Sequence, residues 1–204
     1  MYSQNDEDKI LLEYYKDKSD GVLIEIGAFE SKKFSNSRAL IEKGWTAYLI
    51  DASPFCISKL FEEYKENSKI HIIQSIVTKT KESGLISFWD SPFSAFSSTN
   101  KDNLKRCHKS PEEFDKKTRE IFLSSISINE ILEFVKKREG TVDFLSIDVE
   151  GFSAELSLEV DLNIVKPSCM CIEHDKSYEK IIRKFWNDYE KKLINLENLI
   201  IVKK

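Results

Sequence analysis

The stretch at 21–31, Gly-Val-Leu-Ile-Glu-Ile-Gly-Ala-Phe-Glu-Ser, limits the possible folds more than any other part of the chain. An apolar run ends in Glu25 and Gly27, as in a buried parallel strand that opens into a tight turn. The Ser-Asn-Ser sequence at 35–37 can then cap a helix, which Gly44 ends. The pattern predicts the first half of a βαβ unit.

The second half of the unit is predicted at 45–50, an apolar strand that delivers Asp51, 24 positions after Gly27. In doubly wound folds, a turn that lets the backbone approach a ligand acts together with a carboxylate about 20 residues later to bind an adenine nucleoside. We therefore expect a nucleoside site at this turn. The alternative is a unit that binds nothing, because such a unit shows the same glycine.

The residues around the turn favour one kind of nucleoside. Phe29 and Ser31 stand where a dinucleotide fingerprint has its further glycines, which disfavours an NAD-dependent oxidoreductase. The Glu25 carboxylate would repel a pyrophosphate but not a ligand with ammonium and sulfonium charges. S-adenosylmethionine (SAM) carries both of these charges and is the predicted cofactor.

Composition narrows the class of protein. At 204 residues, with 41% apolar and 32% charged residues, the chain is expected to form one domain over 1–204. The net charge of -4 is small and the lysines are spread among acids, which argues against nucleic acid as the main partner. Without a signal peptide or a long apolar run, we expect a cytoplasmic protein with no membrane span and with reduced thiols. The cysteines are Cys56, Cys107, Cys169 and Cys171, of which the last two are interpreted as core residues of a buried strand.

Helix and strand patterns alternate along the chain. This order predicts a doubly wound α/β fold with a mostly parallel seven-stranded sheet and a C-terminal antiparallel hairpin. It is the layout of the class I SAM-dependent methyltransferases, which is Rossmann-like. An N-terminal helix is expected within 1–20 and a fourth strand at 85–89. Residues 90–126 show little periodicity and are interpreted as a substrate loop or lid, with a disordered excursion as the alternative.

Polar residues also follow two later predicted strands, at the edge of the sheet where such folds bind ligands. The candidate catalytic residues are Asp148, Glu150, Glu173 and His174. One of them could act as a general base on an acceptor hydroxyl, or Asp148, Glu150 and Glu173 could hold Mg²⁺ against it. For any single acid the alternative is a solvated loop residue, and for His174 it is a hydrogen-bonded structural residue.

Motifs spread over nearly the whole chain resemble those of one family, the FkbM-type SAM-dependent methyltransferases. The most specific is Asp-Phe-Leu-Ser-Ile-Asp-Val-Glu-Gly at 143–151. The others are Ser-Gln-Asn-Asp-Glu-Asp at 3–8, Glu-Ile-Gly-Ala at 25–28, Ser-Asn-Ser at 35–37, Gly-Trp at 44–45, Asp51 with Pro54, Pro167, Ile-Glu at 172–173, and the terminal residues 198–203.

The resemblance implies methyl transfer from SAM to a hydroxyl, on a sugar of a glycan or on a secondary metabolite. It implies that Glu25, Gly27 and Ala28 line the methionine end of the cofactor, that Asp51 holds its ribose, and that Asp148 and Glu150 face the methyl group. The residues at 3–4 and 7–8 would close over the cofactor. The full set expected to bind it is Gln4, Glu7, Asp8, Glu25, Gly27, Ala28, Ser35, Asn36, Asp51, Ala52, Ser75 and Asp148.

The chain departs from the family pattern at three positions. The family usually has glycine where this chain has Asp6 and Ser31, and an acid where it has Ser153. Ser31 lies at the nucleoside turn, and it motivates the alternative function, a catalytically silent member that binds a nucleoside or a partner. Retention of Asp51, Asp148 and Glu150 favours the enzyme.

Overall fold

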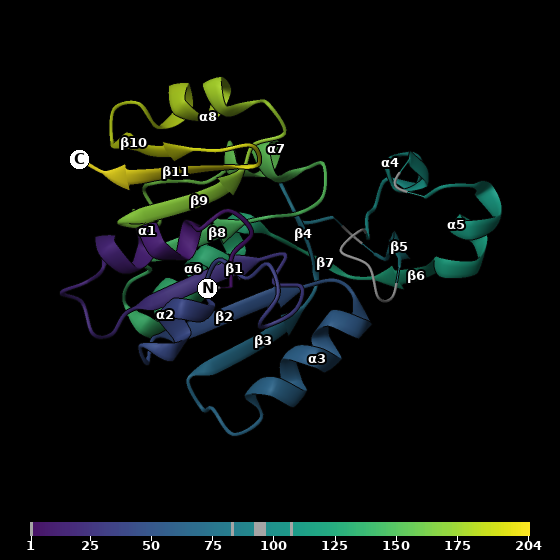
Figure 1. Ribbon diagram of the computed structural model, residues 1–204, viewed down its shortest axis with the longest axis horizontal. Helices are drawn as coiled ribbons and strands as arrows, with labels where there is room; N and C mark the ends of the chain where they lie inside the picture. Colours follow the sequence, from purple (N-terminus) through teal and green to yellow (C-terminus); the bar gives the residue numbers. More distant parts are fainter. Residues whose placement is uncertain (1, 83, 92–96, 107) are drawn as a thin grey trace.

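A seven-stranded sheet forms the centre of the computed structural model, which describes residues 2–82, 84–91, 97–106 and 108–204. The order of its strands across the sheet is β10-β11-β9-β8-β1-β2-β3 (Figure 1). Among the described strands of this sheet, β11 alone runs in the direction opposite to the others, which confirms the predicted fold class. The strands are β1 (Val22–Ile26), β2 (Thr46–Asp51), β3 (Ile70–Gln74), β8 (Phe144–Ile147), β9 (Cys169–Glu173), β10 (Tyr189–Ile194) and β11 (Asn198–Lys203).

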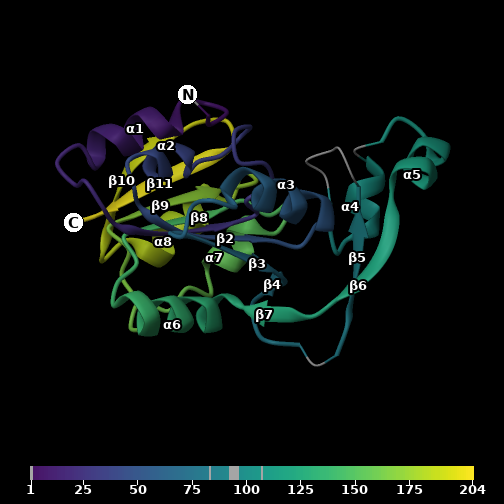
Figure 2. The ribbon, with the colours of Figure 1, turned by 90° about the horizontal axis from the view of Figure 1, so that it is seen from below.

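Helices cover both faces of this sheet, as Figure 2 shows. On one face lie α1 (Glu7–Tyr14), α2 (Arg38–Glu42) and α3 (Pro54–Tyr64), and on the other lie α6 (Ile128–Glu139), α7 (Ser153–Ser157) and α8 (Tyr178–Phe185). Because both faces are covered, the central parallel strands are buried throughout, and β1 and β8 have no exposed residue.

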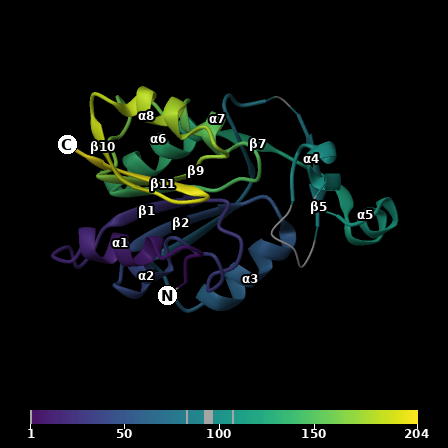
Figure 3. The same cartoon turned by 45° about the horizontal axis from the view of Figure 1, so that its top comes forward.

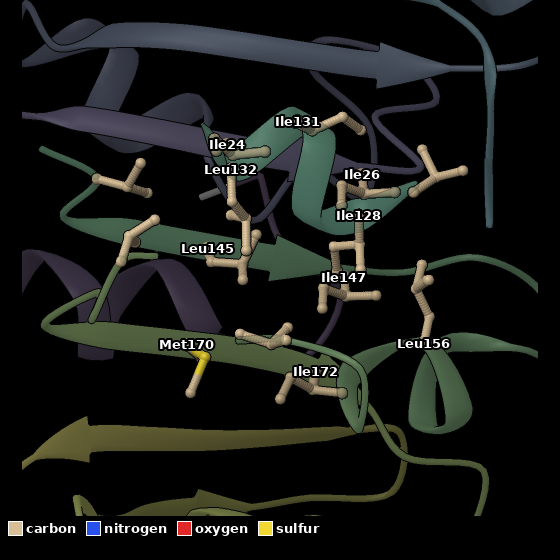
Figure 4. Packing of buried hydrophobic residues seen from close by; sticks show 14 of the residues in the cluster. Ile24, Ile26, Ile128, Ile131, Leu132, Leu145, Ile147, Leu156, Met170 and Ile172 are labelled. Carbon is tan, nitrogen blue, oxygen red and sulfur yellow. The ribbon is translucent and has the colours of Figure 1, made fainter. Parts of the chain in front are cut away.

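The core between the sheet and α6 is built from branched aliphatic side chains. Figure 4 shows Ile24 and Ile26 of β1 facing Ile128 and Leu132 of α6, all of them buried. Burying an aliphatic side chain of this size contributes about 1.5–3 kcal/mol. Alternate residues of each strand therefore anchor the sheet and fix the ends of the strands relative to one another.

The apolar spacing from Ile128 to Val135 predicts a helix that ends at Gly140, and α6 lies there. Ser127 and Glu130 form a reciprocal capping box at its start, and Gly140 ends it in the left-handed conformation with a φ of 80°. For α3, Pro54 occupies the first helical position, as expected.

The segment between β3 and α6 differs from its prediction. β4 (Ile76–Thr78) and β7 (Ser125–Ser127) form a parallel pair that leads to an antiparallel ribbon of β5 (Ile86–Asp90) and β6 (Arg119–Leu123). Two short helices, α4 (Lys101–Arg106) and α5 (Pro111–Lys117), join the ribbon strands. Figures 2 and 3 show this part projecting beyond the sheet. We call residues 86–123 the arm.

The predicted fourth strand therefore lies outside the main sheet, and the described part of 90–126 is regular structure with short connections. The apolar run at 70–77 predicts a third strand, and in the structure this run breaks at Ser75 into β3 and β4. The arm is stabilised by local contacts, such as Trp89 of β5 against Phe114 of α5, whose ring centroids are 5.9 Å apart. Elements this short produce little periodicity in the sequence. The loop residues Pro92, Phe93 and Phe96 lie outside the described residues.

Two further expectations concern the thiols and the membrane. Cys56, Cys169 and Cys171 are free and buried, as the packing interpretation predicted for the last two, while Cys107 lies outside the described residues. No helix in the described ranges has the length and hydropathy to cross a membrane.

Candidate functional site

A cleft of about 460 Å³ opens at the carboxyl ends of the parallel strands. It is lined after β1 by Gly27 and Phe29, after β2 by residues 51–53, and after β8 by residues 148–150. The arm supplies another wall, made by Phe88 and residues 97–99. The polar residues that follow separate strands thus meet at one site, as expected for the ligand edge of an α/β sheet.

Gly27 makes the close turn that separates β1 from the cleft. Its φ is 80°, and its N–H donates to the carbonyl of Ile50 at 2.9 Å. A Cβ at this position would lie 1.7 Å from the carbonyl oxygen of Asp148. The backbones after β1 and β8 approach each other so closely that only glycine fits, which leaves room for a ligand above the turn.

Asp51 lies at the floor of the cleft and fixes two neighbouring loops. Its Oδ2 accepts from the N–H of Phe29 at 2.9 Å, and its Oδ1 accepts from the N–H of Ser53 at 2.8 Å. Burial raises the pKa of Asp51, although these two N–H donors act in the opposite direction. Each carboxylate oxygen has two lone pairs, so both can still accept a hydroxyl of a ribose.

Three carboxyl groups gather on the other side of the cleft. Burial, followed by the charges of Glu173 and Glu150, holds the pKa of Asp148 well above its usual range. Burial also raises the pKa of Glu173, and it raises the pKa of Glu150 to about 7, with a further contribution from the Glu173 charge. When Asp148 is protonated it donates a hydrogen bond to Glu173, and this bond favours the proton on Asp148 over Glu173.

Ser153 holds Glu173 in this group. Its Oγ donates to Glu173 Oε2 at 2.7 Å and lies 2.6 Å from the donating N–H of Val149. Ser153 is fully buried at the start of α7. The departure from the family pattern at this position therefore supplies a hydroxyl donor where an acid would add a fourth negative charge.

The charged residues in the described lining of the cleft are all acidic. The described residues that line the cleft include the acids Asp51, Asp148, Glu150, Glu173 and Glu197, and none of them is Lys, Arg or His. Such a lining attracts cations and disfavours phosphate or carboxylate groups.

Comparison with known proteins decides the family. The model of the methyltransferase FkbM domain matches residues 25–193, most of the chain. The chain belongs to the FkbM methyltransferase family. No curated protein matches the sequence.

This FkbM family member is similar to solved structures of other methyltransferases. A structure described as a "putative caffeoyl-CoA O-methyltransferase" from Staphylococcus aureus is 12% identical, with a TM-score of 0.52, over 98% of this chain and 84% of that one. A TehB-like SAM-dependent methyltransferase from Corynebacterium glutamicum is 6% identical, with a TM-score of 0.45, over 97% of this chain and 88% of that one. The first of these likenesses agrees with the class I methyltransferase fold.

Membership of the family implies SAM as the cofactor, and the cleft fits it. Gly27 leaves the turn open to a ligand, Asp51 offers free acceptor capacity, and the lining suits sulfonium and ammonium charges. The Mg²⁺ alternative lacks such support, because no group of three or more His, Cys, Asp or Glu side chains among the described residues is arranged to hold a metal ion.

Eight of the predicted site residues line the cleft and seven do not. Those that line it are Gln4, Gly27, Asp51, Ala52, Ser75, Asp148, Glu150 and Glu173. The lining does not include Glu7, Asp8, Glu25, Ala28, Ser35, Asn36 or His174.

Glu25 lies beneath the cleft, where it holds the loop before α2. Its Oε1 accepts from the N–H of Asn36 at 3.0 Å and its Oε2 accepts from Ser37 Oγ at 2.5 Å. Only 3% of Glu25 is exposed, and it is not among the described residues that line the cleft. Successive residues of a strand point to opposite faces, and Glu25 points to the face that α2 covers.

We expect the stability contributed by Glu25 to decrease as pH rises. Burial raises its pKa from 4.5 to about 7, although the Ser37 and Asn36 hydrogen bonds lower it. A carboxyl group with a raised pKa in the folded state favours folding in its protonated form, and this contribution is lost between pH 4.5 and 7. Glu25→Gln stays neutral, so its stability relative to wild type should rise by about 2–3 kcal/mol between pH 5 and pH 8. Urea unfolding at both pH values measures this difference, and Glu66→Gln, at an exposed position, is the control. An equal difference at the two pH values would contradict the prediction.

The N-terminal residues tie the chain ends together. The side-chain amides of Asn195 and Asn198 donate to Glu7 Oε1 at 2.7 and 2.9 Å. Burial alone would raise the pKa of Glu7, but these hydrogen bonds lower it. Asp8 accepts from the backbone N–H of Tyr2 at 2.7 Å, and both acids are fully buried. Glu7 therefore fixes α1 against the C-terminal hairpin, whereas Asp8 fixes the N-terminal segment to α1. Neither acid is among the residues that line the cleft.

Gln4 does reach the cleft from this end of the chain. Its Nε2 donates to Glu197 Oε1 at 2.9 Å, which joins the N-terminal segment to the turn between β10 and β11. Glu197 lines the cleft but was not predicted, because a turn acid after an antiparallel strand lies outside the strand-end pattern.

His174 has both ring nitrogens occupied by the backbone. Nδ1 accepts from the N–H of Lys176 at 3.0 Å, so Nε2 carries the proton and donates to the carbonyl of Asn195 at 3.1 Å. Its surroundings match the structural alternative, and we leave it out of the reaction proposed below.

The loop after Gly27 holds two aromatic residues that the sequence did not single out for the site. Phe29 and Phe34 line the cleft with φ values of 45° and 62°, in the left-handed region that non-glycine residues rarely adopt. Their rings stack with centroids 6.4 Å apart. Ser31 is buried and does not line the cleft, while Asp6, where the family has glycine, adopts a left-handed φ of 65°.

Proposed function

We propose that this FkbM family member transfers the methyl group of SAM to a hydroxyl of an uncharged acceptor, such as a sugar of a glycan or a secondary metabolite. The observation that carries the proposal is a single cleft that joins Asp51 to the carboxyl groups of Asp148, Glu150 and Glu173. Asp51 serves the cofactor, and the carboxyl groups serve the reacting hydroxyl.

The choice of an uncharged acceptor follows from the lining. A phosphorylated or carboxylated acceptor would have to enter among five carboxyl groups with no cation from the described lining residues to pair with it. The arm instead offers the apolar ring of Phe88 and the hydroxyls of Ser97, Ser98 and Thr99. Apolar surface with a few hydroxyl groups suits the faces and hydroxyls of a sugar ring.

The chemistry assigned to the protein is proton removal. Bound SAM supplies an activated methyl group, so the chain has to align the acceptor oxygen and accept its proton. Among the described residues, the carboxylate of Glu150 has no hydrogen-bond or ion-pair partner, and its pKa of about 7 is raised by burial and by the charge of Glu173. We assign Glu150 as the general base. The acceptor O–H proton passes to Glu150 as the new oxygen–carbon bond forms and the sulfur–carbon bond breaks.

Asp148 and Glu173 have a supporting role. Burial and the neighbouring charges raise the pKa of Asp148, and a proton on Asp148 keeps Glu150 from facing two full carboxylates. With a pKa near 7, Glu150 is both substantially ionised at neutral pH and basic enough to take a proton.

Calorimetry tests the cofactor assignment without knowledge of the acceptor. Wild-type protein should bind S-adenosylhomocysteine, the product left after methyl transfer, and should show no heat with NAD. Asp51→Ala should weaken this binding by about 1–3 kcal/mol, about 5- to 150-fold, because the ribose hydroxyls lose their acceptor and two backbone N–H groups lose theirs. Asp161→Ala is the control, since Asp161 also accepts from a backbone N–H, that of Asn163 at 2.8 Å, but does not line the cleft.

Two outcomes would overturn parts of the proposal. An absence of heat with S-adenosylhomocysteine would remove the cofactor assignment, and an unchanged dissociation constant in Asp51→Ala would remove the role of this residue. A screen of hydroxylated acceptors with methyl-labelled SAM then tests turnover. Binding without transfer to any sugar or metabolite hydroxyl would favour the catalytically silent alternative.

A further inference from the structure

A chain of two hydrogen bonds connects the cofactor side of the cleft to the arm. The N–H of Ser53 donates to Asp51 Oδ1 at 2.8 Å, and the hydroxyl of the same serine donates to Asp90 Oδ1 at 2.5 Å. Asp90 is the last residue of β5 in the arm, 37 positions from Ser53. Ser53 thus contacts a carboxylate on each side, one from the sheet and one from the arm.

Both members of the outer bond are buried, which makes this contact unusual. Ser53 is 3% exposed and Asp90 is 6% exposed. Among the described residues Asp90 has no ion-pair partner, and its charge raises the pKa of the neighbouring Asp51 as a minor cause after burial. A buried carboxylate beside another one is costly unless something holds it there. An apolar or amide side chain at position 90 would avoid this repulsion.

The start of α3 compensates for the charge of Asp90. Ser53 is the N-cap residue of α3, but its side chain makes no capping bond to this helix and donates to Asp90 instead. The Asp90 carboxylate therefore lies beside the positive end of an 11-residue helix, where a negative charge is stabilised. The arm thus supplies the carboxylate that lies at the N-terminus of α3.

The position of Asp90 determines where the arm meets the cleft. Phe88, two residues before it on the same face of β5, lines the cleft. Ser98 forms the isolated bridge with Trp89 and lines the cleft as well. When Asp90 is seated at Ser53, the acceptor-side residues of the arm are therefore placed over the strand ends.

We infer that Asp90 is a positioning residue that seats the arm on the cofactor-binding edge of the sheet. The inference rests on the proposed function, because it assigns the two ends of the hydrogen-bond chain to the cofactor and to the acceptor. A cofactor bound at Asp51 rigidifies the loop at 51–53 and thereby the seat of Asp90. Cofactor occupancy and arm position are coupled through Ser53.

Hydrogen exchange with and without S-adenosylhomocysteine tests this coupling in the full chain and needs no acceptor. In wild type, the ligand should slow amide exchange about fivefold or more at 51–53 and also at 86–90 and 119–123 in the arm. In Asp90→Ala and in Ser53→Ala, which keeps the N–H to Asp51, the slowing should persist at 51–53 and should fall below about twofold in the arm. Asp90→Asn retains an acceptor for the Ser53 hydroxyl and should restore the slowing in the arm.

Two controls separate coupling from simple loss of structure. Asp102→Ala removes an exposed arm acid that pairs with Lys105 at 3.5 Å, and it should behave as wild type. Thermal unfolding of each variant verifies that the fold persists. Slowing of arm exchange in Asp90→Ala equal to that in wild type would overturn the inference, and so would an absence of slowing in the wild-type arm while 51–53 is protected. No protection anywhere would instead count against the proposed cofactor.

Discussion

Replacing Glu150 with glutamine is expected to lower kcat for methyl transfer by about 10²- to 10⁴-fold, the usual contribution of a general base. Glutamine keeps the shape of the side chain but cannot take the proton of the acceptor hydroxyl. Because Glu150 makes no hydrogen bond to the described residues of the Gly27 turn or the Asp51 loops, affinity for S-adenosylhomocysteine should stay within about threefold of wild type. Steady-state kinetics with an acceptor from the screen, together with calorimetry, measure both quantities.

The pH dependence of kcat in the wild-type enzyme should show the titration of Glu150. Burial and the Glu173 charge raise the pKa of Glu150 to about 7, and only its ionised form can act as base. We therefore expect kcat to fall tenfold per pH unit below this pKa and to level off above it. The control is Glu155→Gln, which changes a mostly exposed acid on α7 that pairs with Lys79 at 3.0 Å. A Glu150→Gln enzyme with near-normal kcat, or a profile that is flat between pH 5 and pH 8, would contradict the assignment.

Replacing Gly27 with alanine is expected to destabilise the protein by about 2–5 kcal/mol and to weaken S-adenosylhomocysteine binding by about 100-fold or more. A methyl group at this position would lie 1.7 Å from the carbonyl oxygen of Asp148, a backbone atom that cannot rotate away. Overpacking of this kind costs about 1–3 kcal/mol, and a left-handed conformation adds about 1–2 kcal/mol for alanine. To relieve the contact, the ends of β1 and β8 have to separate, and the cleft changes shape with them.

Gly140→Ala is the matched control for the backbone conformation. Gly140 also has a φ of 80°, but a Cβ there would meet nothing within 4 Å. It lies at the end of α6, far from the cleft lining. Denaturant unfolding of Gly140→Ala should show only the conformational loss of about 1–2 kcal/mol, with unchanged ligand affinity. Equal effects of the two substitutions would mean that conformation, and not the contact with Asp148, makes Gly27 necessary.

Elements with strong local signals could be predicted from the sequence. The start and end of α6 are encoded by a capping box and a glycine, and α3 begins at its proline. The strand that leads to Gly27 could be predicted because a run of aliphatic residues ends there in a residue that favours turns. Each of these signals depends on a few neighbouring residues, so no knowledge of the rest of the chain was needed.

The arm shows where such signals fail. β5 carries apolar residues on both faces, because Phe88 faces the cleft while Trp89 packs against Phe114 of α5. Its partner β6 begins 29 positions after Asp90. Short strands that pair over such a distance leave little pattern in either segment.

The candidate site divides in a similar way. Asp51, Asp148 and Glu150 immediately follow or end parallel strands, and such positions meet at one edge whatever the side-chain contacts. The places of Glu25 and His174 depend on which face of a strand or turn they point from, and on nearby N–H and hydroxyl donors that satisfy them. The sequence does not distinguish polar residues that line the cleft from polar residues that are held by local hydrogen bonds.

The sequence by itself determined the family, the order of the elements and the edge of the sheet where the acids gather, because these follow from local periodicity, turn chemistry and motif order. Only the tertiary structure decided which acids face the cleft, that Ser153 holds Glu173, and that Asp90 joins the arm to the cofactor side. These contacts link residues from different elements, and their energies depend on burial and distance, which exist only once the chain has folded.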